Sequence, residues 1–108
     1  MTYKQLNCEE TKELIDNENL IIADVRDEDS FKEACIDGAI HLTVSFLSDF
    51  VNDNDKETPI IVYCYHGISS QSVAQHLVDQ GFTQVYSLAG GFKSWQEHIN
   101  QMSNEDER

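Results

Sequence analysis

Short apolar runs alternate along the chain with segments in which apolar residues recur at helical spacing. The continuous β-branched runs predict buried strands, and the strands are predicted at residues 20–25, 39–42, 60–63 and 84–88. Helical spacing predicts helices at residues 8–17, 30–34, 43–52, 70–80 and 92–99. Residues 1–7 form a lead-in with no predicted element. This alternation predicts a three-layer α/β domain with a mainly parallel central sheet flanked by helices.

Individual residues sharpen the ends of these elements. Asp27 or Asp29 can cap the helix at 30–34, and Gly81 suits the position just after the helix at 70–80. The glycines at 90–91 predict a turn that needs positive φ or a close backbone approach. In the helix at 43–52, the apolar residues predicted to face the core are Val44, Leu47 and either Phe50 or Val51.

The length of 108 residues suits one domain with one core. We expect a single domain over residues 1–102 and a disordered acidic tail over residues 103–108. No apolar run approaches the roughly 20 residues that span a bilayer, so no membrane association is expected. Residues 1–6 lack the apolar region of a signal peptide, which predicts a cytoplasmic protein.

The formal charge is −13, from 20 acidic and 7 basic residues. This balance argues against nucleic acid as a partner, because binding to phosphates needs clustered lysine and arginine. The same charge repels small anions at long range. An anionic substrate must therefore be held by local dipoles.

The three cysteines, Cys8, Cys35 and Cys64, are an odd number without paired spacing. In a chain with no export signal they are predicted to be reduced thiols. Cys35 could act as a resolving thiol for Cys64, although a semi-buried small apolar residue is the simpler interpretation.

Cys64 ends the predicted central strand and begins a short loop that runs directly into a helix. Such a strand, loop and helix start direct backbone N–H groups toward one point, where they stabilise an anion such as a thiolate. Gly67 allows close backbone approach, and Ser69 and Ser70 can cap the helix and donate hydroxyl hydrogen bonds. The side chains predicted to point outward are those of Tyr65, His66 and Ile68.

Simpler interpretations of these residues compete with a reactive site. Cys64 could be a buried structural thiol. Cys64 and His66 make a poor zinc pair because no second pair is present, and His66 is a weak candidate for a general base because neighbouring loop side chains splay apart. Arg26 is interpreted as a structural ion-pair partner of an acidic neighbour. Because Cys64 and His66 lack a second pair of ligands, no metal site is predicted.

Four stretches together resemble a known family. They are residues 22–27 (Ile-Ala-Asp-Val-Arg-Asp), 38–42 (Gly-Ala-Ile-His-Leu), 64–70 (Cys-Tyr-His-Gly-Ile-Ser-Ser) and 88–92 (Leu-Ala-Gly-Gly-Phe) with Trp95. In this order and register, from about residue 5 to about residue 99, the chain resembles the single-domain rhodaneses, and most closely the GlpE-type thiosulfate sulfurtransferases.

The resemblance implies an activity and a site. Cys64 would attack the outer sulfur of thiosulfate, release sulfite, and pass the sulfur from a persulfide to cyanide, a dithiol or a thioredoxin-like acceptor. No metal or organic cofactor is needed for this chemistry. The substrate-binding groups would be the loop backbone and hydroxyls of Tyr65, His66, Gly67, Ile68, Ser69 and Ser70.

Two other functions stay open at this point. A non-catalytic rhodanese-like interaction module would share the fold, although such modules commonly lose the cysteine. A related cysteine phosphatase or arsenate reductase would need an arginine at the end of the loop to grip the oxyanion, where this chain has Ser70.

Overall fold

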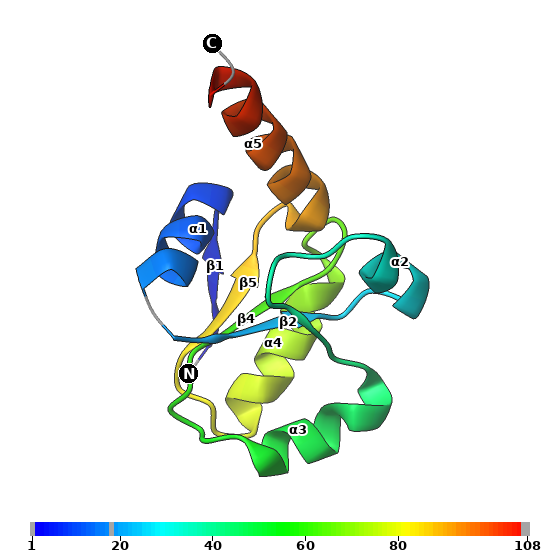
Figure 1. Ribbon diagram of the computed structural model, residues 1–108. Coiled ribbons are helices and arrows are strands. Elements are labelled where there is room, and N and C mark those ends of the chain that lie inside the picture. The colour runs from blue at the N-terminus through cyan, green and yellow to red at the C-terminus, as the bar shows by residue number, and fades with distance from the viewer. Residues whose placement is uncertain (1, 18, 107–108) are drawn as a thin grey trace.

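A computed structural model describes residues 2–17 and 19–106, and its centre is a sheet of five parallel strands (Figure 1). The strands are β1 (Lys4–Leu6), β2 (Ile21–Asp24), β3 (Ile40–His41), β4 (Ile60–Tyr63) and β5 (Val85–Leu88). Their order across the sheet is β1-β5-β4-β2-β3, and every neighbouring pair is parallel. All four residues of the middle strand, β4, are buried. A parallel sheet is covered on both faces, which explains why β4 reads as a continuous apolar run.

Helices cover both faces of the sheet (Figure 1). They are α1 (Cys8–Asn17), α2 (Glu28–Glu33), α3 (Leu47–Asp53), α4 (Ser69–Asp79) and α5 (Gly91–Asp106), with a 3-10 turn η1 (Val44–Phe46) before α3. The core on the side of α3 and α4 includes Phe50, Ala74 and Leu77 packed on residues of β4 and β5. The core on the other side joins Tyr63 to Phe92 of α5, with Ile15 of α1 beside them. The predicted three-layer α/β architecture is confirmed.

Several predicted ends of elements are also confirmed. Asp27 caps α2 by accepting a hydrogen bond from the Ser30 N–H, which starts the helix two residues earlier than predicted. Gly81 follows α4 with a φ of 106°, and the two glycines of the predicted turn have φ values of 78° and 64°. No helix in the described part of the chain is long and apolar enough to cross a membrane.

Three features differ from the predictions. The lead-in contains β1, which pairs with β5 at the edge of the sheet. The helix predicted at 43–52 is divided into η1 and α3, and Val44 is 87% exposed, so its predicted inward position is wrong. A 3-10 turn has three residues per turn rather than 3.6, which rotates Val44 out of the helical phase of Phe50 and Val51. The predicted tail begins at residue 103, whereas α5 continues to Asp106; residues 107 and 108 lie outside the described residues.

Candidate active site

Cys64 directly follows β4, at the carboxyl end of the middle strand of the sheet. The loop after it leads to α4, which begins at Ser69. In an open parallel sheet this end of the strands is where ligands bind. Cys64 is buried, with 6% of its surface exposed, so its sulfur lies at the base of the loop rather than on the surface.

Polar groups from the loop and the start of α4 surround the sulfur of Cys64. The Gly67 N–H lies 3.1 Å from Sγ and the Ser70 N–H lies 3.3 Å from it. The Ser70 hydroxyl oxygen is 3.5 Å from Sγ, and the thiol donates in this hydrogen bond. When the sulfur is ionised, the hydroxyl becomes the donor, so all three groups can then stabilise negative charge on one atom.

The electrostatic balance favours the thiolate. Burial raises the pKa of the Cys64 thiol, because it removes the charged form from water. The hydrogen bonds from the Ser70 hydroxyl and from the backbone N–H groups of Ser70, Gly67 and Ile68 act in the opposite direction. The donors outweigh burial, and the pKa of Cys64 is lowered overall.

The loop conformation depends on close contact with the start of α5. Gly67 has a φ of 86°, and a Cβ there would lie 2.7 Å from Gly90 N and 3.0 Å from Leu88 O. The Phe92 N–H donates to the Cys64 carbonyl at 2.8 Å, and the Lys93 N–H donates to the Tyr65 carbonyl at 3.1 Å. These contacts hold the first two peptide groups of the loop against the start of α5, just before Gly67, whose N–H reaches the sulfur.

The remaining loop side chains are directed to solvent, as predicted. Tyr65 and Ile68 are exposed, and His66 is exposed with its ring packed edge-on against Tyr65. Ser69 is exposed as well. These contacts place Gly67 and Ser70 against the sulfur and leave the side chains of the other loop residues away from it.

The predicted capping role of Ser69 and Ser70 is wrong. The residue at the N-cap of α4 is Ile68, and no side chain caps the helix. The Ser70 hydroxyl is instead fully buried between Cys64 Sγ and the hydroxyl of Ser87, whose oxygen is 2.9 Å away. A helix start that is aimed at an anion uses its free N–H groups for that anion, so a side-chain cap would compete with it.

Sequence reasoning missed Ser87. This serine is buried in β5, and its hydroxyl fixes the position of the Ser70 oxygen. When Ser87 donates to Ser70, the Ser70 proton is free to point at the sulfur. The signal available in the sequence was a single serine between the apolar residues Tyr86 and Leu88, within the strand predicted at 84–88.

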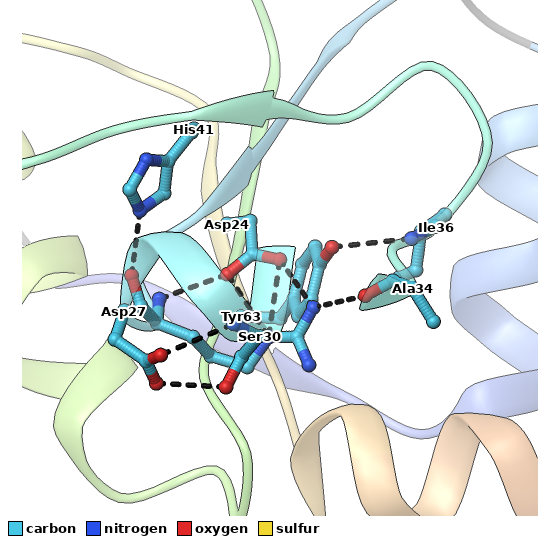
Figure 2. Close-up of polar contacts among 8 residues, drawn as sticks. Asp24, Asp27, Ser30, Ala34, Ile36, His41 and Tyr63 are labelled. Carbon is cyan, nitrogen blue, oxygen red and sulfur yellow. Dashed lines mark hydrogen bonds and ion pairs between the residues drawn. The ribbon is translucent and has the colours of Figure 1, made fainter. Parts of the chain in front are cut away.

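A buried ion pair supports the neighbouring strand end (Figure 2). Arg26 Nη2 donates to Asp24 Oδ2 at 2.6 Å and to the Ala34 carbonyl at 2.6 Å, and the guanidinium lies 4.2 Å from the centre of the Phe92 ring. The Tyr63 hydroxyl accepts the Ile36 N–H, and burial raises the pKa of this tyrosine. The predicted structural role of Arg26 is thus confirmed, since the pair ties β2 to the segment after α2 and to the first turn of α5.

The two other cysteines are Cys8, at the start of α1, and Cys35, in the segment after α2. Cys35 is exposed and free, so the interpretation as a semi-buried residue is wrong, whereas its role as a resolving thiol stays a prediction. Burial raises the pKa of Cys8, and the nearby Glu97 raises it further. Among the described residues, no group of three histidine, cysteine, aspartate or glutamate side chains is arranged to hold a metal ion.

Comparisons with known proteins agree with the resemblance seen in the sequence. The family model described as a rhodanese-like domain matches residues 7–98. The chain is 55% identical to a protein of Coxiella burnetii named thiosulfate sulfurtransferase GlpE, over 91% of this chain and 92% of that protein. It is 42% identical to the protein of the same name from Pseudoalteromonas translucida, over 89% of this chain and 91% of that one.

Solved structures show the same fold. A crystal structure of a rhodanese-related protein from Thermoplasma volcanium superposes with a TM-score of 0.77 at 24% identity. The match covers 89% of this chain and 93% of that one. At this identity the likeness concerns the fold alone.

Proposed function

The chain belongs to the rhodanese-like domain family and is a sulfurtransferase of the rhodanese type, and we propose that it transfers the outer sulfur of thiosulfate through a persulfide on Cys64. The observation that carries this proposal is the convergence of the Gly67 and Ser70 N–H groups on Cys64 Sγ, at 3.1 and 3.3 Å. These donors lower the pKa of the thiol in spite of its burial, and the thiolate is the form of cysteine that attacks sulfur.

In the first half-reaction, the Cys64 thiolate attacks the outer sulfur of thiosulfate. A new S–S bond forms to Cys64, the S–S bond of thiosulfate breaks, and sulfite leaves with the electron pair of that bond. The charge of −3 on the two reactants is carried afterwards by a persulfide anion and a sulfite dianion. We expect the loop donors that hold the thiolate to stabilise the charge of the added sulfur in the same way.

In the second half-reaction, a nucleophile takes the outer sulfur. With cyanide, a C–S bond forms to give thiocyanate, and the Cys64 thiolate is released with the electrons of the broken S–S bond. Both steps are displacements at sulfur, so the proposed mechanism requires no metal or organic cofactor. The protein alternates between a free and a persulfide form, which predicts ping-pong kinetics.

The substrate is held by dipoles rather than by cations. We propose that the backbone of residues 65–70 and the Ser70 hydroxyl bind the transferred sulfur, with the N–H groups of Gly67, Ile68 and Ser70 as the main donors. With a chain charge of −13, long-range attraction cannot concentrate thiosulfate at the site. A modest affinity for thiosulfate is therefore expected.

The phosphatase alternative lacks its essential side chain. At the end of the loop, Ser70 is fully buried against the sulfur, where an arginine would have to reach an oxyanion. Among the residues that the structure describes, the one arginine is Arg26, which is paired with Asp24 and has 7% of its side chain exposed. The alternative of a non-catalytic module is disfavoured because the cysteine and its donors are all present.

The test is to incubate the purified protein with thiosulfate and measure intact mass and peptide masses. We expect a gain of one sulfur atom on Cys64, equimolar release of sulfite, and loss of the added sulfur on addition of cyanide. Cys64→Ser, which is nearly isosteric, is the control and should gain nothing. An unmodified Cys64 would support the interaction module, and release of phosphate from p-nitrophenyl phosphate without any reaction with thiosulfate would support the phosphatase.

A further inference from the structure

An apolar groove of about 670 Å³ extends to Ser69, where the loop after Cys64 ends and α4 begins. Ser69, which lines the groove, is adjacent to Ser70, whose N–H holds the sulfur of Cys64. The groove lies between the segment after β2, the segment from β3 to α3, and the first turns of α4. Its apolar walls are formed by Val25, Leu42, Val44, Phe46, Leu47 and Val73.

Large apolar side chains on the rim of this groove are exposed to solvent rather than packed in the core. Val44 is 87% exposed and Phe46 is 61% exposed, although Phe50 and Val51, in the next turns, fill the core. On the loop beside the groove, Ile68 is 73% exposed. Exposed apolar residues scattered singly need no explanation, but a cluster around a groove marks a surface that binds something.

The polar end of the groove carries a net negative charge that comes from Asp27. Asp27 and Glu28 line it, and the pKa of Asp27 is lowered by the hydroxyl and N–H of Ser30, which are neutral donors that leave its charge intact. Glu28 is paired with Lys32 at 2.8 Å, which offsets its charge, and His41 also lines the groove, with its Nε2 hydrogen-bonded to the Arg26 carbonyl. Arg26 also lines the groove, but its charge is offset by Asp24. A ligand with a neutral or positive end fits this rim better than an anion does.

We propose that this groove binds the acceptor in the second half-reaction and selects small thiols with an apolar chain that ends in a neutral or cationic group. The inference rests on the proposed function of Cys64. The volume suits a small molecule, since such pockets measure about 300–1,000 Å³. An anionic thiol is disfavoured twice, by the acidic rim and by the overall charge of −13.

The transfer itself is balanced without an oxidant or a reductant. The acceptor thiol loses its proton and attacks the outer sulfur of the Cys64 persulfide anion. An S–S bond forms to the acceptor while the S–S bond to Cys64 breaks, and the Cys64 thiolate leaves with that electron pair. The proton ends on the new persulfide, so a thiol and a protein persulfide become an acceptor persulfide and a protein thiolate.

The first experiment compares acceptors that differ in one feature at a time, with saturating thiosulfate. The probes are 2-mercaptoethanol, 6-mercaptohexan-1-ol, 6-aminohexane-1-thiol and 6-mercaptohexanoate. We expect kcat/KM to rise about tenfold from the two-carbon to the six-carbon alcohol, because the longer chain is buried in the groove. The amine should equal or exceed the alcohol, and the carboxylate should fall about fivefold below it.

The second experiment changes the groove. Phe46→Ser removes apolar wall and should reduce the preference for the six-carbon over the two-carbon alcohol to about twofold. Ile40→Ser is the matched control, because Ile40 is also an exposed apolar residue, at 43%, but does not line the groove. It should leave the preference unchanged. Asp27→Asn keeps a residue that can cap α2 while removing the charge, and should narrow the gap between the alcohol and the carboxylate.

Three failures can be told apart by measuring sulfur loading of Cys64 in the same samples. If the persulfide forms but all four thiols react alike, or Phe46→Ser and Ile40→Ser behave alike, the groove inference is overturned and sulfur transfer stands. If the persulfide forms and only a protein-borne thiol accepts the sulfur, the proposed class of acceptor is overturned. If no persulfide forms on Cys64, the proposed function itself has failed.

Discussion

Two of the three cysteines lie near the start of a helix, yet their surroundings shift the pKa values of the two thiols in opposite directions. Cys8 is the first residue of α1, and Cys64 lies in the loop that leads into α4. Burial raises the pKa of both thiols. The pKa of Cys64 is nevertheless lowered, whereas that of Cys8 is raised, with Glu97 adding to the effect.

The difference arises from where the N–H groups of each helix start are directed. At α1, the Asn7 side chain accepts the Glu10 N–H at 2.8 Å, and the Glu10 carboxylate accepts the Asn7 N–H at 3.0 Å. This reciprocal cap uses donors that could otherwise bind an anion. At α4 no side chain caps the helix, and the Ser70 N–H is directed at Cys64 Sγ. A nearby helix start therefore does not activate a thiol unless its donors are left free and aimed at the sulfur.

The largest expected effect comes from removing each thiol in turn. Cys64→Ser should lower sulfur transfer by on the order of 1,000-fold or more, because a serine hydroxyl at neutral pH neither ionises nor accepts sulfur. Cys8→Ser should keep activity within about twofold and cost about 1 kcal/mol of stability, as its thiol packs at the edge of the core. Sulfite release from thiosulfate in the presence of cyanide is the measurement. An equal loss of sulfur-transfer activity in both variants would contradict the conclusion that only Cys64 is activated by its surroundings.

The next largest effect comes from Gly67→Ala. The φ of 86° is strained for alanine, and its Cβ would lie 2.7 Å from Gly90 N, so the loop must move away from α5. We expect roughly 100-fold lower kcat, since one aimed donor is worth about that much, and a loss of roughly 3 kcal/mol in the free energy of unfolding.

Gly38→Ala is the matched control for this change. Gly38 has nearly the same φ, 84°, but a Cβ there meets nothing within 4 Å. This variant carries the conformational strain without the collision, so it should lose about 1 kcal/mol of stability and no activity. Denaturant unfolding and initial rates, measured on both variants, separate the two contributions. Loss of activity in Gly38→Ala would mean that general destabilisation, rather than donor placement, controls the rate.

The contrast between these glycines also shows what the sequence could reveal. Gly67 stands between a strand-ending cysteine and a helix, and this local order was enough to predict inward N–H groups and outward side chains. The continuous apolar run of β4 was likewise enough to place Cys64 at the carboxyl end of a buried strand. Local order and hydrophobic pattern thus predicted the position of the sulfur and the layers of the fold.

Features that depend on tertiary partners were not predictable in this way. β1 (Lys4–Leu6) is a short strand at the edge of the sheet, paired only with β5. Because an edge strand is less buried than a central one, its sequence contains no apolar run that would have predicted it. Ser87 looks like any strand residue until β5 is brought beside β4 and its hydroxyl meets that of Ser70. The exposure of Val44 follows from a change of helix type, which the spacing of apolar residues does not encode.

A smaller effect should follow from the hydroxyl pair beside the sulfur. Ser70→Ala removes the donor that contributes most to lowering the pKa of Cys64, so that pKa should rise. Alkylation of Cys64 by iodoacetamide should then be about tenfold slower at pH 7, and its pH profile should move to higher pH while the rate at high pH is kept. Ser87→Ala should shift the profile in the same direction by less, about threefold at pH 7. An unchanged profile in both variants would leave the backbone N–H groups as the sole stabilisers.

The smallest expected effect comes from the net charge of the whole molecule. It can be separated by ionic strength from the effect of the local hydrogen-bond donors that distinguish Cys64 from Cys8. A charge of −13 repels the thiosulfate dianion, and salt screens this repulsion over about 10 Å at 0.1 M. Raising the ionic strength from about 0.02 to about 0.15 M should therefore increase kcat/KM for thiosulfate about twofold. Alkylation of Cys64 by iodoacetamide, which is neutral, is the control and should not respond, because donors in van der Waals contact with a buried sulfur are hardly screened. A steep fall in kcat/KM with salt would instead require a positive surface near the loop, and the donors alone could then no longer account for the binding of thiosulfate.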